Sequence, residues 1–452
     1  MRPRRIPAPT TVKTHSEVRH GVYLGLTWLL LALPMAAAGQ RVDPTPARAV
    51  TSDDEITKAV EVTRTHPSDT AWSHLGDVFM QKARETFDLS YYARAEAAYR
   101  KAIDLNATQA DALAGMAWVE SARHEFEQSI DWANRALAVQ PNRPDAYGLL
   151  GDAAVEMGDY DKAFEHYQKM LDIRPDISSY SRAAHLLFLT GDVKKGTWLM
   201  MKAIAAGAPY AENTAWCRAQ LALMQFAEGA YLPASQVLAD ALTKAPGNYH
   251  VLAALGKVKA ALKDYPAAID YYKQAEAVVP QHEVVVALGD IYALQGNQRD
   301  ADAQYALVEV IRKLNRANGV IGDLQWVQFS TDHDRNLPQA LRMAESEYKT
   351  RPNVYAADIL AWCYFKNSMI PDARRYIDKA LSRKTPEAMF LYHKGVIYAA
   401  SRETATARTA LYQALSLNPN FHPIESAAAM KRINELGSVP MEAATSDRSP
   451  HH

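Results

Sequence analysis

The sequence predicts an all-α fold, a solenoid of about ten antiparallel helix–turn–helix repeats, and three observations support it. The stretch Arg143–Pro175 has apolar residues at helical spacing on both sides of a Gly-Asp break. A small residue of that stretch recurs along the chain at a nearly constant period. The composition, 48% hydrophobic and 22% charged residues, is typical of a folded chain and not of a disordered one.

The stretch Arg143–Pro175 reads as one structural unit. Its first half predicts a helix, because residues at i, i+3, i+4 and i+7 share a face: Tyr147, Leu150, Gly151 and Ala154. Gly158-Asp159 ends that helix, since glycine tolerates positive φ and aspartate caps the next helix. Ala163, Tyr167 and Met170 mark a second helix. Two helices in about 34 residues cannot bury their own apolar faces, so the unit must stack on copies of itself.

The position of Ala163 recurs with a regular spacing. Its steps are 34, 34, 33, 38, 34, 33, 39, 33 and 34 residues, and each equivalent is small: Ala95, Ser129, Ala163, Gly196, Ala234, Ala268, Ala301, Ala340, Ala373 and Ala407. The first helices carry equivalents of Gly151, all small except Gln328: Gly76, Ala117, Ala184, Ala222, Gly256, Gly289, Gln328, Ala361 and Gly395. Small residues are expected where two helices cross closely, because larger ones would overpack the crossing at a cost of about 1–3 kcal/mol.

This pattern of Leu-Gly, Ala, Tyr and Pro resembles the tetratricopeptide repeat. The resemblance covers residues 69–420 and implies a right-handed superhelical solenoid whose first helices line a concave groove that holds a protein or peptide partner. It also implies protein–protein interaction without catalysis. In its layout the chain looks like bacterial exported tetratricopeptide-repeat proteins.

The chain divides into six predicted segments. Residues 1–38 resemble a signal peptide, with basic residues, an uncharged core at Val22–Leu33 and Ala36–Ala38 before Gly39. An uncleaved membrane anchor facing the periplasm is the alternative. A linker (39–52), an N-terminal capping helix (53–67), ten repeats (68–420), a C-terminal capping helix (421–437) and a disordered tail (438–452) follow. The first repeat has about seven extra residues near Arg84–Tyr91. We expect an exported protein, in a bacterial periplasm or secreted.

The net charge of the chain after residue 38 limits the classes of partner that it can bind. Residues 1–38 hold five basic residues and one acidic residue, so the rest has 45 Lys+Arg against 50 Asp+Glu, a net charge of −5. This acidic balance argues against nucleic acid as a partner.

No nucleotide-binding, serine-hydrolase or zinc-protease motif occurs, so we expect no enzyme and no cofactor. Thr331–Asp334 could hold a cation, but the cluster lacks a second His or Cys at ligand spacing, so we expect no metal. Cys217 and Cys363 lie four repeats apart and are expected to be buried thiols without a mutual disulfide.

Aromatic and acidic residues beside the core stripe form the candidate partner site. The strongest group is in repeats eight and nine, where Trp326, Phe329, Trp362 and Phe365 would form an exposed aromatic surface near Asp332 and Asp358. The earlier repeats would contribute Trp118, His185, Phe188 and Phe226. The alternative interpretation is that these aromatic residues fill the core. We expect a non-enzymatic scaffold for a protein or peptide; the alternative is a periplasmic assembly factor or chaperone for a cytochrome or metalloenzyme complex.

Overall fold

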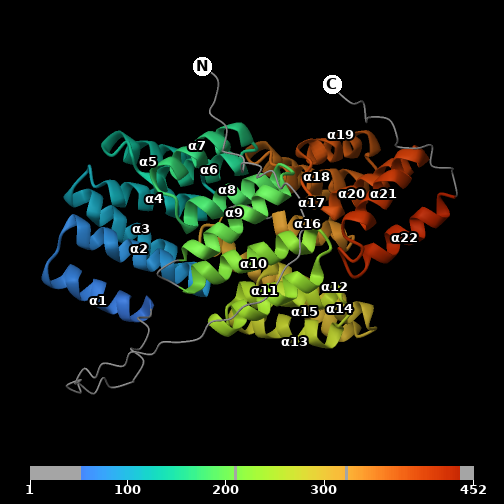
Figure 1. Ribbon diagram of the computed structural model, residues 1–452, viewed down its shortest axis with the longest axis horizontal. Coiled ribbons are helices and arrows are strands. Elements are labelled where there is room, and N and C mark those ends of the chain that lie inside the picture. The colour runs from blue at the N-terminus through green and yellow to red at the C-terminus, as the bar shows by residue number, and fades with distance from the viewer. Residues whose placement is uncertain (1–51, 208–210, 321–323, 438–452) are drawn as a thin grey trace, which may run out of the picture. The chain divides into compact units, whose positions relative to one another are not determined.

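The computed structural model describes residues 52–207, 211–320 and 324–437, which belong to one compact unit (Figure 1). Within these ranges the secondary structure consists of 22 α-helices and one short 3₁₀ turn, Leu381–Arg383. The predicted signal peptide, most of the linker and the C-terminal tail lie outside the described residues. No helix in the described ranges is both long and apolar enough to cross a membrane.

Ten consecutive helix pairs make up the described chain. The first helices of the pairs are α2 (Asp69–Thr86), α4 (Ala110–Ala122), α6 (Pro144–Glu156), α8 (Ile177–Leu189), α10 (Ala211–Ala227), α12 (Tyr249–Ala261), α14 (His282–Leu294), α16 (Leu324–Asp332), α18 (Val354–Lys366) and α20 (Ala388–Ala400). The second helices are α3 (Ser90–Leu105), α5 (Phe126–Val139), α7 (Tyr160–Ile173), α9 (Val193–Ala206), α11 (Tyr231–Lys244), α13 (Tyr265–Val278), α15 (Gln298–Ala317), α17 (Leu337–Thr350), α19 (Ile370–Ala380) and α21 (Thr404–Leu417). Helices α1 (Ser52–Thr65) and α22 (Glu425–Glu435) flank the pairs. Each helix packs on its sequence neighbour, so the predicted all-α repeat solenoid is confirmed.

The small residues lie where the two helices of a pair cross. The side chains of Ala95, Ala163, Ala268, Ala301, Ala373 and Ala407 are fully buried. In repeat two, Ser129 Oγ donates a hydrogen bond to the Ala117 carbonyl at 2.9 Å. A Cβ atom added to Gly196 would lie 2.9 Å from the Ala184 carbonyl oxygen, so no larger residue fits without a shift. Gln328, in contrast, is exposed and does not lie at the crossing of repeat eight.

In four repeats a tyrosine of the second helix packs against a glycine of the first. A Cβ atom on the glycine would lie within 2.2 to 2.6 Å of the ring in the pairs Gly76–Tyr99, Gly151–Tyr167, Gly256–Tyr272 and Gly289–Tyr305. Each tyrosine follows the small residue of its own helix by four positions. The two residues therefore lie on the same face of the second helix, toward the first helix of the pair. Leu411 takes this position against Gly395 in repeat ten. Glycine is required here because the ring occupies the space of a side chain.

Turns of repeats three, four and five contact loops that lie nearly 200 residues later in the chain. We call these contacts the closure seam. Its three parts join Glu156–Tyr160 to Arg351–Val354, Leu189–Gly191 to Lys384–Thr385, and Phe226–Tyr231 to Asn418–Asn420. In Figure 1 the helices that flank these loops, α17 to α22, are coloured orange to red. The seam ties the second half of the solenoid back onto the first.

Hydrogen bonds hold each part of the closure seam. Arg351 Nη2 lies 2.7 Å from Glu156 Oε2, and the backbone N–H of Val354 donates to Tyr160 Oη at 3.0 Å. Thr385 Oγ1 donates to the Leu189 carbonyl at 2.6 Å, and Asn418 Nδ2 to the Phe226 carbonyl at 2.7 Å. These bonds satisfy buried polar groups that would otherwise cost about 1–3 kcal/mol each.

The turn glycines of the closure seam explain why the backbones approach so closely. Gly158 has a φ of +71°, and a Cβ there would lie 2.5 Å from the Pro352 carbonyl oxygen. Gly191, with a φ of +84°, would meet the Lys384 carbonyl at 2.9 Å. Equivalent turns outside the seam accept side chains at positive φ, as Lys263 and Ser368 do. Glycine is therefore needed at the seam turns mainly for the close contact.

Replacing Tyr160 by Phe should destabilise the fold by about 1–3 kcal/mol, because the buried N–H of Val354 loses its acceptor. Chemical denaturation and amide hydrogen exchange of α18 measure the effect. Tyr265→Phe is the matched control, since Tyr265 starts the second helix of repeat six as Tyr160 does in repeat three and has no such contact among the described residues. Equal stability of the two variants would contradict a stabilising closure seam.

Candidate functional site

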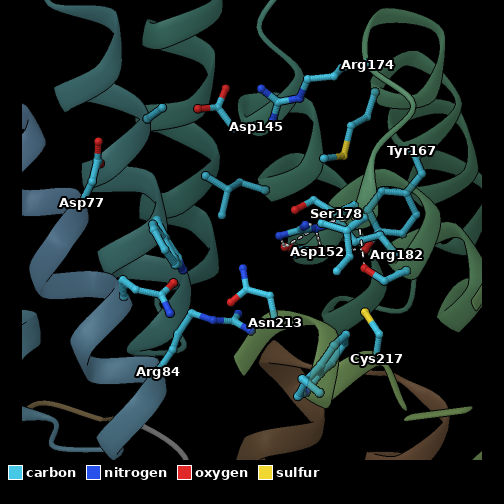
Figure 2. Close-up of a pocket in the computed structure, with 18 of the residues that line it drawn as sticks. Asp77, Arg84, Asp145, Asp152, Tyr167, Arg174, Ser178, Arg182, Asn213 and Cys217 are labelled. Carbon is cyan, nitrogen blue, oxygen red and sulfur yellow. Dashed lines mark hydrogen bonds and ion pairs between the residues drawn. The ribbon is translucent and has the colours of Figure 1, made fainter. Parts of the chain in front are cut away.

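A cavity of about 690 Å³ lies among the first five repeats (Figure 2). We call it the cup. Its walls come from the first helices α2, α4, α6, α8 and α10, with Tyr167 and Met170 of α7 and the following Arg174 completing one side. This volume is within the range of about 300–1,000 Å³ that is common for ligand sites.

The length of α2 closes the cup on one side. Helix α2 has 18 residues, whereas α4, α6 and α8 have 13 each, and the extra turn carries Arg84. The Arg84 guanidinium donates from Nε and Nη2 to the two oxygens of Glu212 on α10, at 3.3 Å each. Phe87, in the left-handed conformation after α2, contacts the ring of Tyr249 with centroids 6.0 Å apart. The extra residues seen in the sequence thus connect repeat one to repeats five and six.

The arginines of the cup are all paired with carboxylates. Arg143 bridges Asp111 and Asp145, with nitrogen–oxygen distances of 2.8 Å to both. Arg182 donates from Nε and Nη2 to Asp152, at 2.9 and 3.0 Å. Burial alone would lower the pKa of Arg182, but Asp152 raises it above its ordinary value. Arg182 therefore stays charged, and its charge is neutralised by its partner.

Tyrosines of the helix crossings hold two carboxylates that line the cup. Tyr99 Oη donates to Asp77 at 2.7 Å, and Tyr167 Oη donates to Asp152 at 2.7 Å. Each aspartate directly follows the glycine on which the tyrosine ring packs. The packing that joins the two helices of a repeat therefore also orients a carboxylate of the cup.

Asp77 differs from the other acids of the cup. It forms no ion pair within the described part of the chain, and Tyr99 is its hydrogen-bond partner. Asp77 is exposed to solvent within the cup, but the atoms packed around its carboxyl group raise its pKa to about 6, although the Tyr99 hydrogen bond opposes the shift. Asn213 Oδ1, on α10, is buried and has no hydrogen-bond partner among the described residues. The cup thus has two acceptors that other side chains do not fully satisfy.

Two of the predicted partner residues lie in the cup. Trp118 and His185 are half-buried and line the cavity. Burial lowers the pKa of His185, so its ring is neutral at neutral pH. Phe188 and Phe226 are 6% and 7% exposed and belong to the hydrophobic core between helices.

The aromatic residues of repeats eight and nine do not form an exposed surface. Trp326, Phe329 and Trp362 are 2%, 4% and 6% exposed. The Trp362 ring stacks on Phe365, which is half-buried, and on His393, with centroids 4.9 and 4.1 Å apart. The expectation that these rings are available to a partner is therefore wrong, because neighbouring helices cover them.

The two acidic residues predicted beside those rings, Asp332 and Asp358, lie in different environments. Asp358 is buried and accepts from His393 Nδ1 at 2.9 Å. Asp332 is exposed at the end of α16. His333, which follows Asp332, contacts Asp290 of α14 through Nε2 at 2.9 Å. No set of three potential metal ligands occurs in residues 52–207, 211–320 and 324–437.

Both cysteines are buried, unpaired thiols. Cys217 lines the cup, and burial raises its pKa to about 12; burial also raises the pKa of Cys363 to about 12. Both thiols are therefore unreactive at neutral pH.

Several residues of the cup were not predicted, among them Arg84, Arg143, Arg182 and Asn213. Arg182 packs over Gly148 of the preceding repeat, since a Cβ atom added to that glycine would lie 3.3 Å from Arg182 Nε. This contact joins two repeats, and no pattern within one repeat indicates it. Asn213 lies in the first turn of α10, after the longer step of 38 residues between Gly196 and Ala234, where the repeat pattern carries no information.

Stacked helix pairs around a charged cup define a helical-repeat scaffold, a class that presents concave surfaces to partners. Residues 115–176 and 360–420 match the family model described as tetratricopeptide repeat. The other helix pairs share the same register of small residues. These two segments are similar to the tetratricopeptide repeat, and the remaining helix pairs share their helical-repeat fold.

Several solved structures are similar to the chain at low identity. A tetratricopeptide repeat protein from Parabacteroides merdae is 18% identical, with 54% of this chain and 93% of that chain covered and a TM-score of 0.40. Yeast Tom70 is 14% identical, with 85% and 92% covered and a TM-score of 0.37. The human IFIT1 dimer with m7Gppp-AAAA is 12% identical, with 74% and 77% covered and a TM-score of 0.48. These similarities concern the fold alone. No curated protein matches the chain.

Replacing Arg84 by Ala should destabilise the protein and loosen the closed side of the cup. Glu212 is 8% exposed at its side chain, so the loss of Arg84 leaves a buried carboxylate without its partner. Such a loss costs about 3–5 kcal/mol for a fully buried pair, and the partial exposure of Arg84 reduces the cost to about 1–3 kcal/mol. Arg100→Ala, which removes an exposed pair with Glu96 on α3, is the control and should change stability by about 0.5 kcal/mol or less. Equal denaturation midpoints for the two variants would argue against the Arg84–Glu212 closure.

Proposed function

We propose that this protein is an exported, non-enzymatic scaffold that binds an extended segment of a protein or peptide in the cup. The observation that carries the proposal is the partly open cavity between α2 and α10, lined by charged side chains and by Trp118 and Trp216. A tetratricopeptide-repeat scaffold supports a role in protein–protein interaction. The half-buried indole rings offer apolar contact area, and aromatic residues dominate the energetic centres of interfaces.

The size of the cup favours a chain segment over a folded domain. Five first helices surround the cavity, and the Arg84–Glu212 pair bridges from repeat one to repeat five. A folded domain presents a broad convex surface, which a cavity of about 690 Å³ does not accommodate. An extended peptide can instead insert individual side chains and satisfy polar groups of the walls with its backbone.

The charges of the cup favour a protein partner over nucleic acid. Arg143, Arg182 and Arg84 are each neutralised by carboxylates of the chain. Binding of a nucleic-acid backbone depends on cationic groups that can replace its counterions. A phosphate backbone entering the cup would compete with these carboxylates, so we expect no nucleic-acid partner.

Export is part of the proposal and rests on residues 1–38. Their order of basic residues, uncharged core and Ala36–Ala38 is typical of a cleaved signal. N-terminal sequencing of the protein from its host should give a chain that begins at Gly39. A chain that begins at Met1 would favour the membrane anchor.

A photo-crosslinking amino acid tests the binding site. Placed at Ser178, which lines the cup, it should form adducts with a partner polypeptide in the native host. Placed at Gln128, an exposed position of α5 outside the cup, it should not. Mass spectrometry of the adducts identifies the crosslinked segment. Absence of adducts at position 178, or equal yields at both positions, would contradict binding in the cup.

A further inference from the structure

The charges of the cup are not balanced. The four arginines that line it, Arg84, Arg143, Arg174 and Arg182, are each paired with a carboxylate: Glu212, Asp111 and Asp145, Asp176, and Asp152. These pairs use five carboxylates, and Asp77 is a sixth. No lysine is among the residues that line the cup. The cup with its direct partners therefore has an excess of negative charge.

The cup also has hydrogen-bond acceptors that the side chains around them do not fully satisfy. Asp77 accepts one hydrogen bond, from Tyr99, although a carboxylate can accept about four. Asn213 Oδ1 is buried without a donor in the described part of the chain. In Figure 2 Asp77 and Asn213 border the same cavity from α2 and α10. An occupant that brings several donors would satisfy both groups.

The indole rings favour a positively charged donor over a neutral one. Trp118 and Trp216 line the cup, and an aromatic face attracts a cation within about 6 Å of its centroid. A lysine or arginine side chain also has an apolar stem, which can pack on a ring while its charged end reaches a carboxylate. An anionic side chain would be repelled by the unpaired Asp77 and would gain little from arginines that are already paired with carboxylates.

We propose that the occupant of the cup is an extended peptide segment with a lysine or arginine side chain, whose charged end pairs with Asp77. The proposal rests on the proposed function, since it names the chemistry of the segment that the cup binds. The Tyr99 hydroxyl donates a hydrogen bond to the Asp77 carboxylate, so the acceptor is positioned before the ligand arrives. Specificity for the basic residue then comes from one carboxylate of repeat one.

A displayed library of random peptides, selected on the full-length protein, tests the proposal. Enriched peptides should share a lysine or arginine, and selection on Asp77→Asn should remove this preference. Asp104→Asn is the matched control, because Asp104 is exposed on α3 of the same repeat and does not line the cup. Replacing the basic residue of the best peptide by norleucine should weaken binding to the wild type about tenfold or more, and binding to Asp77→Asn by less than about threefold.

The results of this selection distinguish failure of the basic-residue preference from failure of peptide binding in the cup. Ser178→Trp, which places a bulky ring in the cup, should weaken binding of the selected peptides. Peptides that bind in the cup without a preference for a basic residue, or that keep the preference in Asp77→Asn, would overturn the inference and leave the scaffold function standing. If no peptide is enriched, or if Ser178→Trp binds every selected peptide as tightly as the wild type, both proposals fail.

Discussion

The close crossing of two helices at small residues is the constraint on which the rest of this structure depends. Ala95 and Ala163 are fully buried at such crossings, and tyrosines four residues later fill the space over Gly76 and Gly151. A repeat of this size has no core of its own, so stability comes from this packing and from the neighbouring repeats. Since overpacking is costly, the crossing fixes both the angle between the helices and the position of each tyrosine.

The tyrosines packed at the crossings also fix the position of two carboxylates that line the cup. Tyr99 and Tyr167 each donate to an aspartate that follows the glycine beneath the ring. Tyr305 repeats the arrangement with Asp290 in repeat seven, where the aspartate also contacts His333. The same tyrosine–aspartate pair therefore lies beside the cup in the first repeats and forms part of an internal hydrogen-bond network in repeat seven.

The sequence predicted the fold well because its signal is periodic. Glycine, alanine and tyrosine recur at about 34 residues, and stacking geometry depends on little else. The site was harder to predict, and the aromatic residues of repeats eight and nine were assigned to the wrong environment. Helical spacing places Trp362 on a face, but contacts from the next repeat, including His393, decide whether that face is covered. The closure seam depends on contacts such as Glu156–Arg351, which no local pattern indicates.

Packing around the Tyr99–Asp77 pair sets the charge state of Asp77 in the cup, and the titration of this carboxyl group tests that dependence most directly. Carboxyl carbon NMR should give a pKa of about 6, well above the unperturbed value of about 3.9. Because Asp77 binds its proton more tightly in the folded than in the unfolded chain, its contribution to stability falls as pH rises from about 4 to 6. In Tyr99→Phe the pKa should rise further, since the hydrogen bond that favours the charged form is lost. A pKa near 3.9 in the wild type, or one unchanged in Tyr99→Phe, would contradict the account.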